Sequence, residues 1–257
     1  MRRWVAPAAI LLALIGAWQL AARLDLLAHA LHIEPFLVPA PSDIARSLWS
    51  DRGLLADNGW VTLKEVLGGF AVSVAAGVLF AAVLHVSPTL RRATYPLLVA
   101  SQTVPIVVVA PILVVWLGFG IGPKLAIIAL ICFFPITVNT LDGLGSVDPD
   151  LLKMMRTLDA SRMQTFRRVE GPSALPYFFS GAKIAVAVAV IGAVFGEWAG
   201  SSSGLGHLIQ QASAQLQTAR TFAAVVVLSA LAIVLFGLLA VIERRVAWWG
   251  PRSTRTP

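Results

Sequence analysis

The chain has 257 residues, of which 58% are hydrophobic and only 13% are charged. Soluble domains carry roughly 25% charged residues, so this composition excludes an ordinary soluble domain and indicates an integral membrane protein. The net charge of +7 is therefore interpreted by the position of the cations relative to a membrane, not as a nucleic-acid-binding surface. The one cysteine, Cys132, excludes an intrachain disulfide and a cysteine-based metal cluster.

Six apolar runs each approach the roughly 20 residues that a helix needs to cross a bilayer. We therefore expect an all-α integral membrane protein with six transmembrane helices in one domain, residues 1–257. Pro105 and Pro111 are expected to kink the third of these spans. The expected spans are residues 5–22, 61–84, 95–117, 123–141, 176–195 and 222–242.

Three features refine this assignment. The first run could belong to a secretory signal, but it continues through Trp18 and Ala22, beyond the roughly 7–15 residues of a signal core, so a retained span is favoured. Gly68-Gly69 and Gly77 indicate that the second span packs closely against another helix. Residues 196–221 are too polar and glycine-rich to cross lipid, and they favour a short re-entrant or surface helix.

A polar segment, residues 148–172, separates the fourth and fifth expected spans. Asp148 followed by Pro149 predicts the start of a helix. Ser161 and Gln164 have the spacing of a capping box, which predicts a second helix start. Pro172, together with the later Pro176, is expected to end this second helix. Five cations exclude the segment from lipid: Lys153, Arg156, Arg162, Arg167 and Arg168.

Each of these two short helices carries an apolar stripe at helical spacing. The stripe of the first contains Leu151, Leu152, Met155 and Leu158, and that of the second contains Met163 and Phe166. Two amphipathic helices held outside a membrane favour docking into a partner. The alternative is a solvated basic loop without a docking role.

The cations are concentrated on the side of the polar segment and of both expected termini. That side would hold Arg2, Arg3, Arg91, Arg92, Arg244, Arg245, Arg252 and Arg255 in addition to the five cations of the segment. The opposite side would hold Arg23, Arg46, Arg52, Lys64, Lys124 and Arg220. The positive-inside rule then places the segment and both termini in the cytoplasm.

No pattern of catalytic chemistry is visible in the sequence. It contains no phosphate-binding GxxxxGK[ST] loop and no HExxH or comparable metal spacing, so we expect no enzyme and no cofactor or metal bound by this chain. The expected spans hold almost no acidic residues, which proton-coupled carriers usually need. Glu197, near the end of a span, is expected to line a path or to lie at the outer interface. A stand-alone ion-coupled carrier remains the alternative to a permease driven by a soluble partner.

The polar segment resembles the cytoplasmic EAA loop of ABC importer permeases, whose pattern is EAA, three residues, Gly, nine residues and Ile-x-Leu-Pro. Lys153-Met154-Met155 aligns with EAA, Asp159 with the glycine, and Val169-Glu170-Gly171-Pro172 with the final motif. The resemblance extends over residues 35–245. It includes Phe36-Leu-Val-Pro39-Ala-Pro41-Ser, Trp116-Leu-Gly-Phe-Gly120, Phe133-Phe-Pro135-Ile and Val147-Asp-Pro149.

Two departures from the EAA pattern have physical interpretations. Asp adopts a left-handed turn more readily than most residues, so Asp159 can stand where the family has glycine. Lys153 reverses the charge of the family's glutamate, which predicts an ATPase partner with a compensating acid.

The resemblance implies that the chain lies in a bacterial inner membrane, and it implies how such a chain works. Two permease chains, here expected as a homodimer, form the pore, and each polar segment docks into a cytoplasmic ATPase that binds ATP and Mg. A periplasmic or lipid-anchored binding protein delivers the substrate. The residues expected to couple the permease to the ATPase are Met155, Leu158, Asp159, Ala160, Ser161, Met163, Phe166 and Pro172.

Within the family, the chain resembles the nitrate, sulfonate and taurine permeases and their thiamine-precursor and riboflavin relatives. Ser101-Gln-Thr-Val-Pro105, Asn139-Thr-Leu-Asp142-Gly and Gly192-Ala-Val-Phe-Gly196-Glu-Trp198 favour the group that transports heterocycles. The expected path residues are Gln102, Thr103 and Asn139, in addition to Glu197. The alternative role of these polar residues is hydrogen bonding between helices.

Overall fold

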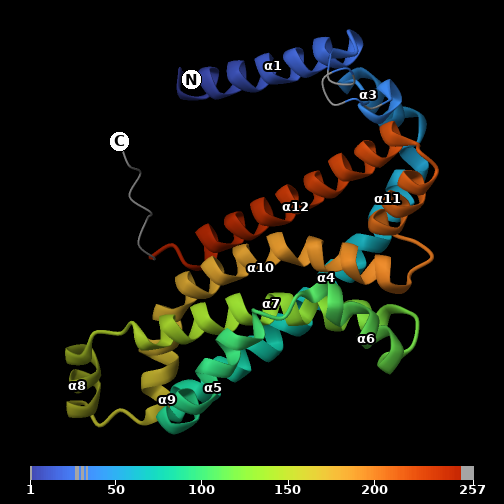
Figure 1. The fold of residues 1–257 in the computed structure, drawn as a ribbon. Helices are drawn as coiled ribbons and strands as arrows, with labels where there is room; N and C mark the ends of the chain where they lie inside the picture. Colours follow the sequence, from blue (N-terminus) through green and yellow to red (C-terminus); the bar gives the residue numbers. More distant parts are fainter. Residues whose placement is uncertain (1, 27–28, 30–31, 33, 250–257) are drawn as a thin grey trace. The chain divides into compact units, whose positions relative to one another are not determined.

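The computed structural model describes residues 2–26, 29, 32 and 34–249, and this part of the chain is helical, without strands (Figure 1). The all-α class is therefore confirmed. The cations at Arg252 and Arg255 and the side chains of Arg2 and Arg3 lie outside this description. The α-helices are α1 (Arg2–Arg23), α3 (Pro41–Ser50), α4 (Arg52–Val86), α5 (Pro88–Ser101), α6 (Ile106–Leu117), α7 (Ile121–Gly145), α8 (Pro149–Thr157), α9 (Arg162–Thr165), α10 (Gly171–Gly200), α11 (Leu205–Ala214) and α12 (Thr218–Val246), and the shorter turns are the 3-10 helix η1 (Pro35–Leu37) and the π-helix η2 (Phe166–Glu170).

Four helices in the described part of the chain are long and apolar enough to cross a membrane: α4, α7, the helix Arg162–Gly200 and α12. The pair formed by α5 and α6 makes a fifth span if it is counted as one crossing. The described apolar part of α1, Ala9–Arg23, is shorter than a span. The chain is thus a multi-pass membrane protein, and the count of six crossings stays a prediction.

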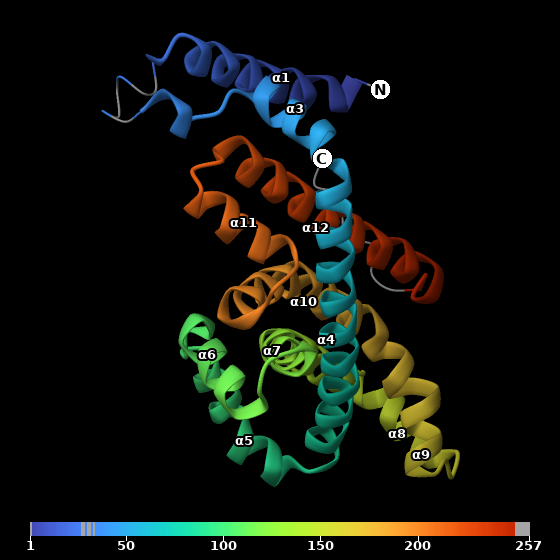
Figure 2. The same ribbon diagram turned by 90° about the vertical axis from the view of Figure 1, so that its right-hand side faces the viewer.

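The third expected span, residues 95–117, is wrong as a single kinked helix. It is broken after Ser101, α6 starts at Ile106, and the two helices are bent by 100° relative to each other (Figure 2). Pro105 donates no backbone hydrogen bond and disfavours helical geometry in the residue before it, so the chain leaves the helix there. Pro111, in contrast, lies inside α6.

The fifth expected span also differs from the structure. Pro172 and Pro176 do not end a short helix, because α9, η2 and α10 follow one another without a break over Arg162–Gly200. The π-turn η2 comes immediately before Pro172, and the Gly171 N–H bonds to the Phe166 carbonyl in the wider ring of that turn. The helix also continues past residue 195 to Gly200, so Glu197 lies inside it.

The helices group into two compact units, which are described separately. Unit 1 comprises Met1–Val61 and Ser202–Ala230, and unit 2 comprises Thr62–Ser201 and Leu231–Pro257. Unit 1 contains a small apolar core in which Ile44 and Leu55 pack with Leu205 and Leu208. The expected short helix within residues 196–221 is confirmed as α11, which supplies two of these core residues.

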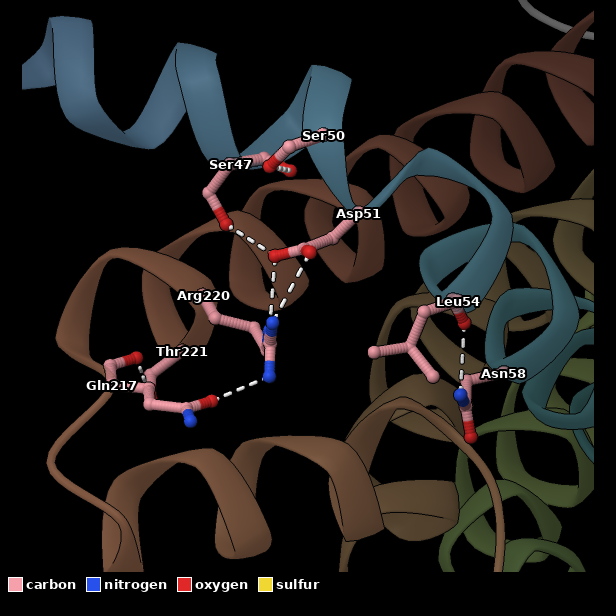
Figure 3. A network of polar contacts seen from close by, with 8 residues as sticks. All are labelled: Ser47, Ser50, Asp51, Leu54, Asn58, Gln217, Arg220 and Thr221. Atoms are coloured by element: carbon pink, nitrogen blue, oxygen red, sulfur yellow. Dashed lines mark hydrogen bonds and ion pairs between the residues drawn. The ribbon is translucent and has the colours of Figure 1, made fainter.

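An ion pair in unit 1 joins the first turn of α12 to the junction between α3 and α4 (Figure 3). Arg220 donates to both carboxylate oxygens of Asp51, from Nε at 2.9 Å and from Nη2 at 3.1 Å. Ser47 Oγ donates to the same carboxylate at 2.9 Å. The hydrogen bond from Arg220, more than the one from Ser47, holds the pKa of Asp51 below its usual value.

In unit 2, α7 packs closely against both α4 and α10 at glycine positions. A Cβ added at Gly69 of α4 would lie 2.5 Å from the Cβ of Ile128, and one added at Gly77 would lie 2.9 Å from the Cγ2 of Ile136. The close contact predicted for these glycines is confirmed. On the other side of α7, a Cβ at Gly181 of α10 would lie 2.4 Å from the Pro135 carbonyl oxygen.

We expect Gly181→Ala to lower the stability of unit 2 by about 1–3 kcal/mol, because backbone atoms would have to separate to accept the new methyl group. Thermal unfolding of the purified protein in detergent measures this loss. Gly237→Ala in α12 is the matched control, because a Cβ at Gly237 meets nothing within 4 Å. This control should be neutral or stabilising. Equal unfolding midpoints for the two variants would contradict the close approach of α7 and α10.

Candidate functional site

The segment of residues 148–172, called the elbow below, starts at two helix caps that the sequence predicts. Asp148 Oδ1 accepts a hydrogen bond from the Asp150 backbone at 2.8 Å, and Pro149 occupies the first turn of α8. Ser161 Oγ accepts from the Gln164 backbone at 3.2 Å, and Gln164 Oε1 accepts from the Ser161 backbone at 2.8 Å. Both the N-cap and the capping box are confirmed.

The chain reverses between α8 and α9 at Asp159. This residue has a φ of +49°, in the left-handed region that favours glycine. The prediction that Asp159 adopts the left-handed conformation, in place of the family's glycine, is therefore confirmed. The turn is closed by the Ala160 backbone, which donates to the Met155 carbonyl at 3.0 Å.

A groove of about 840 Å³ lies along the elbow, and Trp249 contributes to its wall. Of the residues expected to couple the permease to an ATPase, five line this groove: Met155, Leu158, Asp159, Ala160 and Pro172. Leu158 is 67% exposed. Ser161, Met163 and Phe166 belong to the elbow but not to the groove lining, although Met163 is also exposed.

Long-range contacts hold the elbow against the spans of unit 2. His85 at the end of α4 lies 3.3 Å from the Glu170 carboxylate in η2. The Trp249 indole N–H donates to the Pro172 carbonyl at 3.2 Å. Sequence reasoning missed both contacts because their partners are far apart in the chain.

The expected path residues occupy three different settings. Gln102 and Thr103 lie together and exposed in the break between α5 and α6. Asn139 is half-buried on α7, where its side chain donates to the Pro135 carbonyl at 2.8 Å and faces Gly181. Glu197 is fully buried and accepts a hydrogen bond from Thr62 Oγ1 at 2.6 Å. The expectation that Glu197 lies at an outer interface is therefore wrong.

A buried ion pair between α4 and α7 was also missed. Lys124 Nζ lies 2.7 Å from Glu65 Oε1, and it donates to Ser201 Oγ at 2.6 Å. Glu65 is 3% exposed and Lys124 is 7% exposed. Lys124 was expected among the cations of the outer side, and Glu65 is the one acidic residue within the six expected spans. The available signal was an acid in an apolar span, which needs a partner.

These features describe a helical membrane protein with a structured polar elbow between two spans, the arrangement that the resemblance to transport permeases predicts. The family described as "binding-protein-dependent transport system inner membrane component" matches residues 73–248. The chain belongs to this family and is a membrane permease of an ABC importer, a transport subunit rather than an enzyme. This membership favours the importer over the stand-alone ion-coupled carrier.

Several curated relatives match most of the chain. A formylaminopyrimidine transport permease of Halalkalibacterium halodurans is 37% identical over 95% of this chain and 95% of its own. A riboflavin transport system permease of Chloroflexus aurantiacus is 35% identical over 83% of this chain and 81% of its own. A taurine transport system permease of Escherichia coli is 29% identical over 92% of this chain and 87% of its own.

Solved structures show the same fold at lower identity. The inward-facing methionine ABC transporter MetNI has a chain that aligns with a TM-score of 0.64 and 20% identity, covering 78% of this chain and 98% of that one. A chain of an amino acid ABC transporter aligns with a TM-score of 0.59 and 17% identity, covering 77% and 97%.

We expect Lys124→Met to destabilise the protein by about 3–5 kcal/mol, because Glu65 would be left buried without its partner. Thermal unfolding in detergent provides the measurement. Lys153→Met is the matched control, because Lys153 and its partner Asp150 are 72% and 83% exposed. An exposed pair of this kind contributes about 0–1 kcal/mol. The double variant Glu65→Gln/Lys124→Met should recover part of the lost stability, because it removes the unpaired charge. Similar unfolding midpoints for Lys124→Met and Lys153→Met would exclude a buried pair.

Proposed function

We propose that two copies of this chain form the pore of an importer for a heterocyclic vitamin precursor. A thiamine pyrimidine precursor is favoured, riboflavin comes next, and sulfonate, taurine or nitrate follow. The observation that carries this proposal is the 37% identity to a formylaminopyrimidine permease over 95% of both chains. The taurine permease reaches only 29%.

The break between α5 and α6 is the part of the path that the geometry supports best. Non-helical backbone at membrane depth is tolerated only where protein buries it or where it lines a water-filled cavity. Gln102 and Thr103 are exposed there, and Thr103 Oγ1 bonds to the nearby Ala100 carbonyl at 2.8 Å. A second permease chain would cover this break and enclose the path. An amide and a hydroxyl suit a flat, neutral or weakly charged heterocycle.

Asn139 and Glu197 support the path indirectly in this proposal. Asn139 faces Gly181 at the contact between α7 and α10, and Glu197 pairs with Thr62 of α4. Both therefore take part in the packing of helices, which was the alternative role for polar residues in the spans.

The elbow is the proposed docking site for a cytoplasmic ATPase, which would bind ATP and Mg. Exposed apolar side chains such as Leu158 mark a surface that a partner covers. Lys153, which reverses the family's charge, lies 2.8 Å from Asp150 of the same helix, so the chain supplies one acid itself. In this arrangement the elbow and both termini lie in the cytoplasm, and a substrate-binding protein docks on the opposite side.

The substrate is tested by uptake into proteoliposomes that contain the permease with its ATPase and binding protein, isolated together from native membranes. We expect ATP-dependent uptake of labelled formylaminopyrimidine. Unlabelled riboflavin should reduce this uptake more strongly than unlabelled taurine does. Competition by taurine without uptake of the pyrimidine would contradict the proposed substrate class. Uptake by the permease alone on an ion gradient would contradict the importer itself.

Leu158→Asp should weaken association with the ATPase by at least about tenfold, because docking would bury an unpaired charge in the groove. Co-purification of the ATPase with the tagged permease measures the loss. Leu216→Asp is the control: Leu216 is 58% exposed in the turn between α11 and α12, outside the elbow. It has a φ of +57°, which Asp tolerates. Equal co-purification with both variants would remove the elbow as the docking site.

A further inference from the structure

We propose that Trp249 is a positioning residue that clamps the elbow to the end of α12, so that this contact controls how well ATPase closure is transmitted to the spans. This inference rests on the proposed docking of an ATPase at the elbow. It adds a residue outside the elbow, which neither the sequence patterns nor the family match assign to coupling.

The spacing of two prolines leaves one backbone carbonyl open to such a clamp. In an α-helix each carbonyl accepts a hydrogen bond from the N–H of the residue four positions later. The residue four positions after Pro172 is Pro176, which has no N–H. The helix therefore provides no such donor for the Pro172 carbonyl. The Trp249 indole N–H fills this position at 3.2 Å.

Trp249 is firmly connected to the rest of unit 2. It lies three positions beyond Val246, the last residue of α12. Before it, the Ala247 backbone continues the helical pattern by donating to the Glu243 carbonyl at 2.8 Å. The Glu243 side chain lies 2.7 Å from Lys183 Nζ on α10. The end of α12 is thus tied to α10 by an ion pair, and Trp249 adds a second tie at the start of that helix.

The bond lies where the elbow joins the span. Just before Pro172, the helix passes through the π-turn η2, and π-turns and prolines are the usual sites at which helices bend. Trp249 also lines the groove together with Leu158 and Met155, so a partner seated in the groove would contact both sides of this joint. The bond ties Pro172 to the end of α12, which Glu243 also ties to Lys183 further along α10, so the two ties resist bending of this helix at Pro176. Motion of the elbow at Pro172 is then passed to the span.

The test compares Trp249→Phe with wild type in the full complex of permease, ATPase and binding protein in proteoliposomes. Phenylalanine keeps an aromatic ring in the groove but removes the N–H donor. We expect ATPase co-purification to stay within twofold of wild type, whereas binding-protein-stimulated ATP hydrolysis falls roughly two- to tenfold, the range of one net hydrogen bond. Trp248→Phe is the matched control, because Trp248 is 72% exposed and contacts Trp249 edge-on.

A second substitution separates the clamp from a general packing role. Pro176→Ala restores the missing backbone N–H, so the Pro172 carbonyl no longer depends on Trp249. Trp249→Phe should therefore have no further effect on stimulated hydrolysis in the Pro176→Ala background. The same loss in both backgrounds, or no loss in either, would overturn the clamp.

The clamp and the docking site fail in different ways. If Leu158→Asp leaves ATPase association intact, the docking site is wrong, whatever Trp249 does. The hydrogen bond can then still be judged from thermal unfolding of wild type, the two single variants and the double variant of Trp249 and Pro176, which requires no ATPase. A nonzero coupling between the two substitutions supports the bond, and additive effects on the unfolding midpoint exclude it.

Discussion

The constraint on which this structure depends is that a backbone polar group inside a membrane needs a partner within the protein. The long helices α4 and α12 contain no proline, so their carbonyls can be satisfied by hydrogen bonds along the helix. Prolines remove such donors elsewhere, among other places in the break between α5 and α6 and at the start of α10, as well as at Pro135 inside α7. At the first, exposed polar residues mark a proposed path. At the second, the Pro172 carbonyl belongs to the elbow outside the spans, and the Trp249 indole supplies the donor that the helix lacks.

Close helix packing in unit 2 places these two regions on a common framework. Glycines on α4 and α10 let α7 approach both helices at backbone distance. Two polar contacts add to this packing: Lys124 of α7 pairs with Glu65 of α4, and Thr62 of α4 donates to Glu197 of α10. Interlocked side chains and buried pairs of this kind oppose sliding of one helix past another.

The sequence predicts the features of the elbow that depend on neighbouring residues. The caps at Asp148 and Ser161 and the left-handed turn at Asp159 are local, because each is decided by side chains within a few positions. The same local rules failed at Pro172, since a proline ends a helix only where the preceding turn cannot widen to accept it. They also could not find the pair of Glu65 with Lys124, or that of Trp249 with Pro172, because only the fold brings these residues together.

The buried pair of α4 and α7 also has a consequence for biogenesis. Glu65 leaves the ribosome well before Lys124, which lies 59 positions later in the chain. The hydropathy of α4 suits it to enter the membrane first, with the carboxylate near the start of the expected span. The later segment then brings the amine that pairs with this carboxylate. Synthesis order and helix pairing are in this way linked by a single carboxylate.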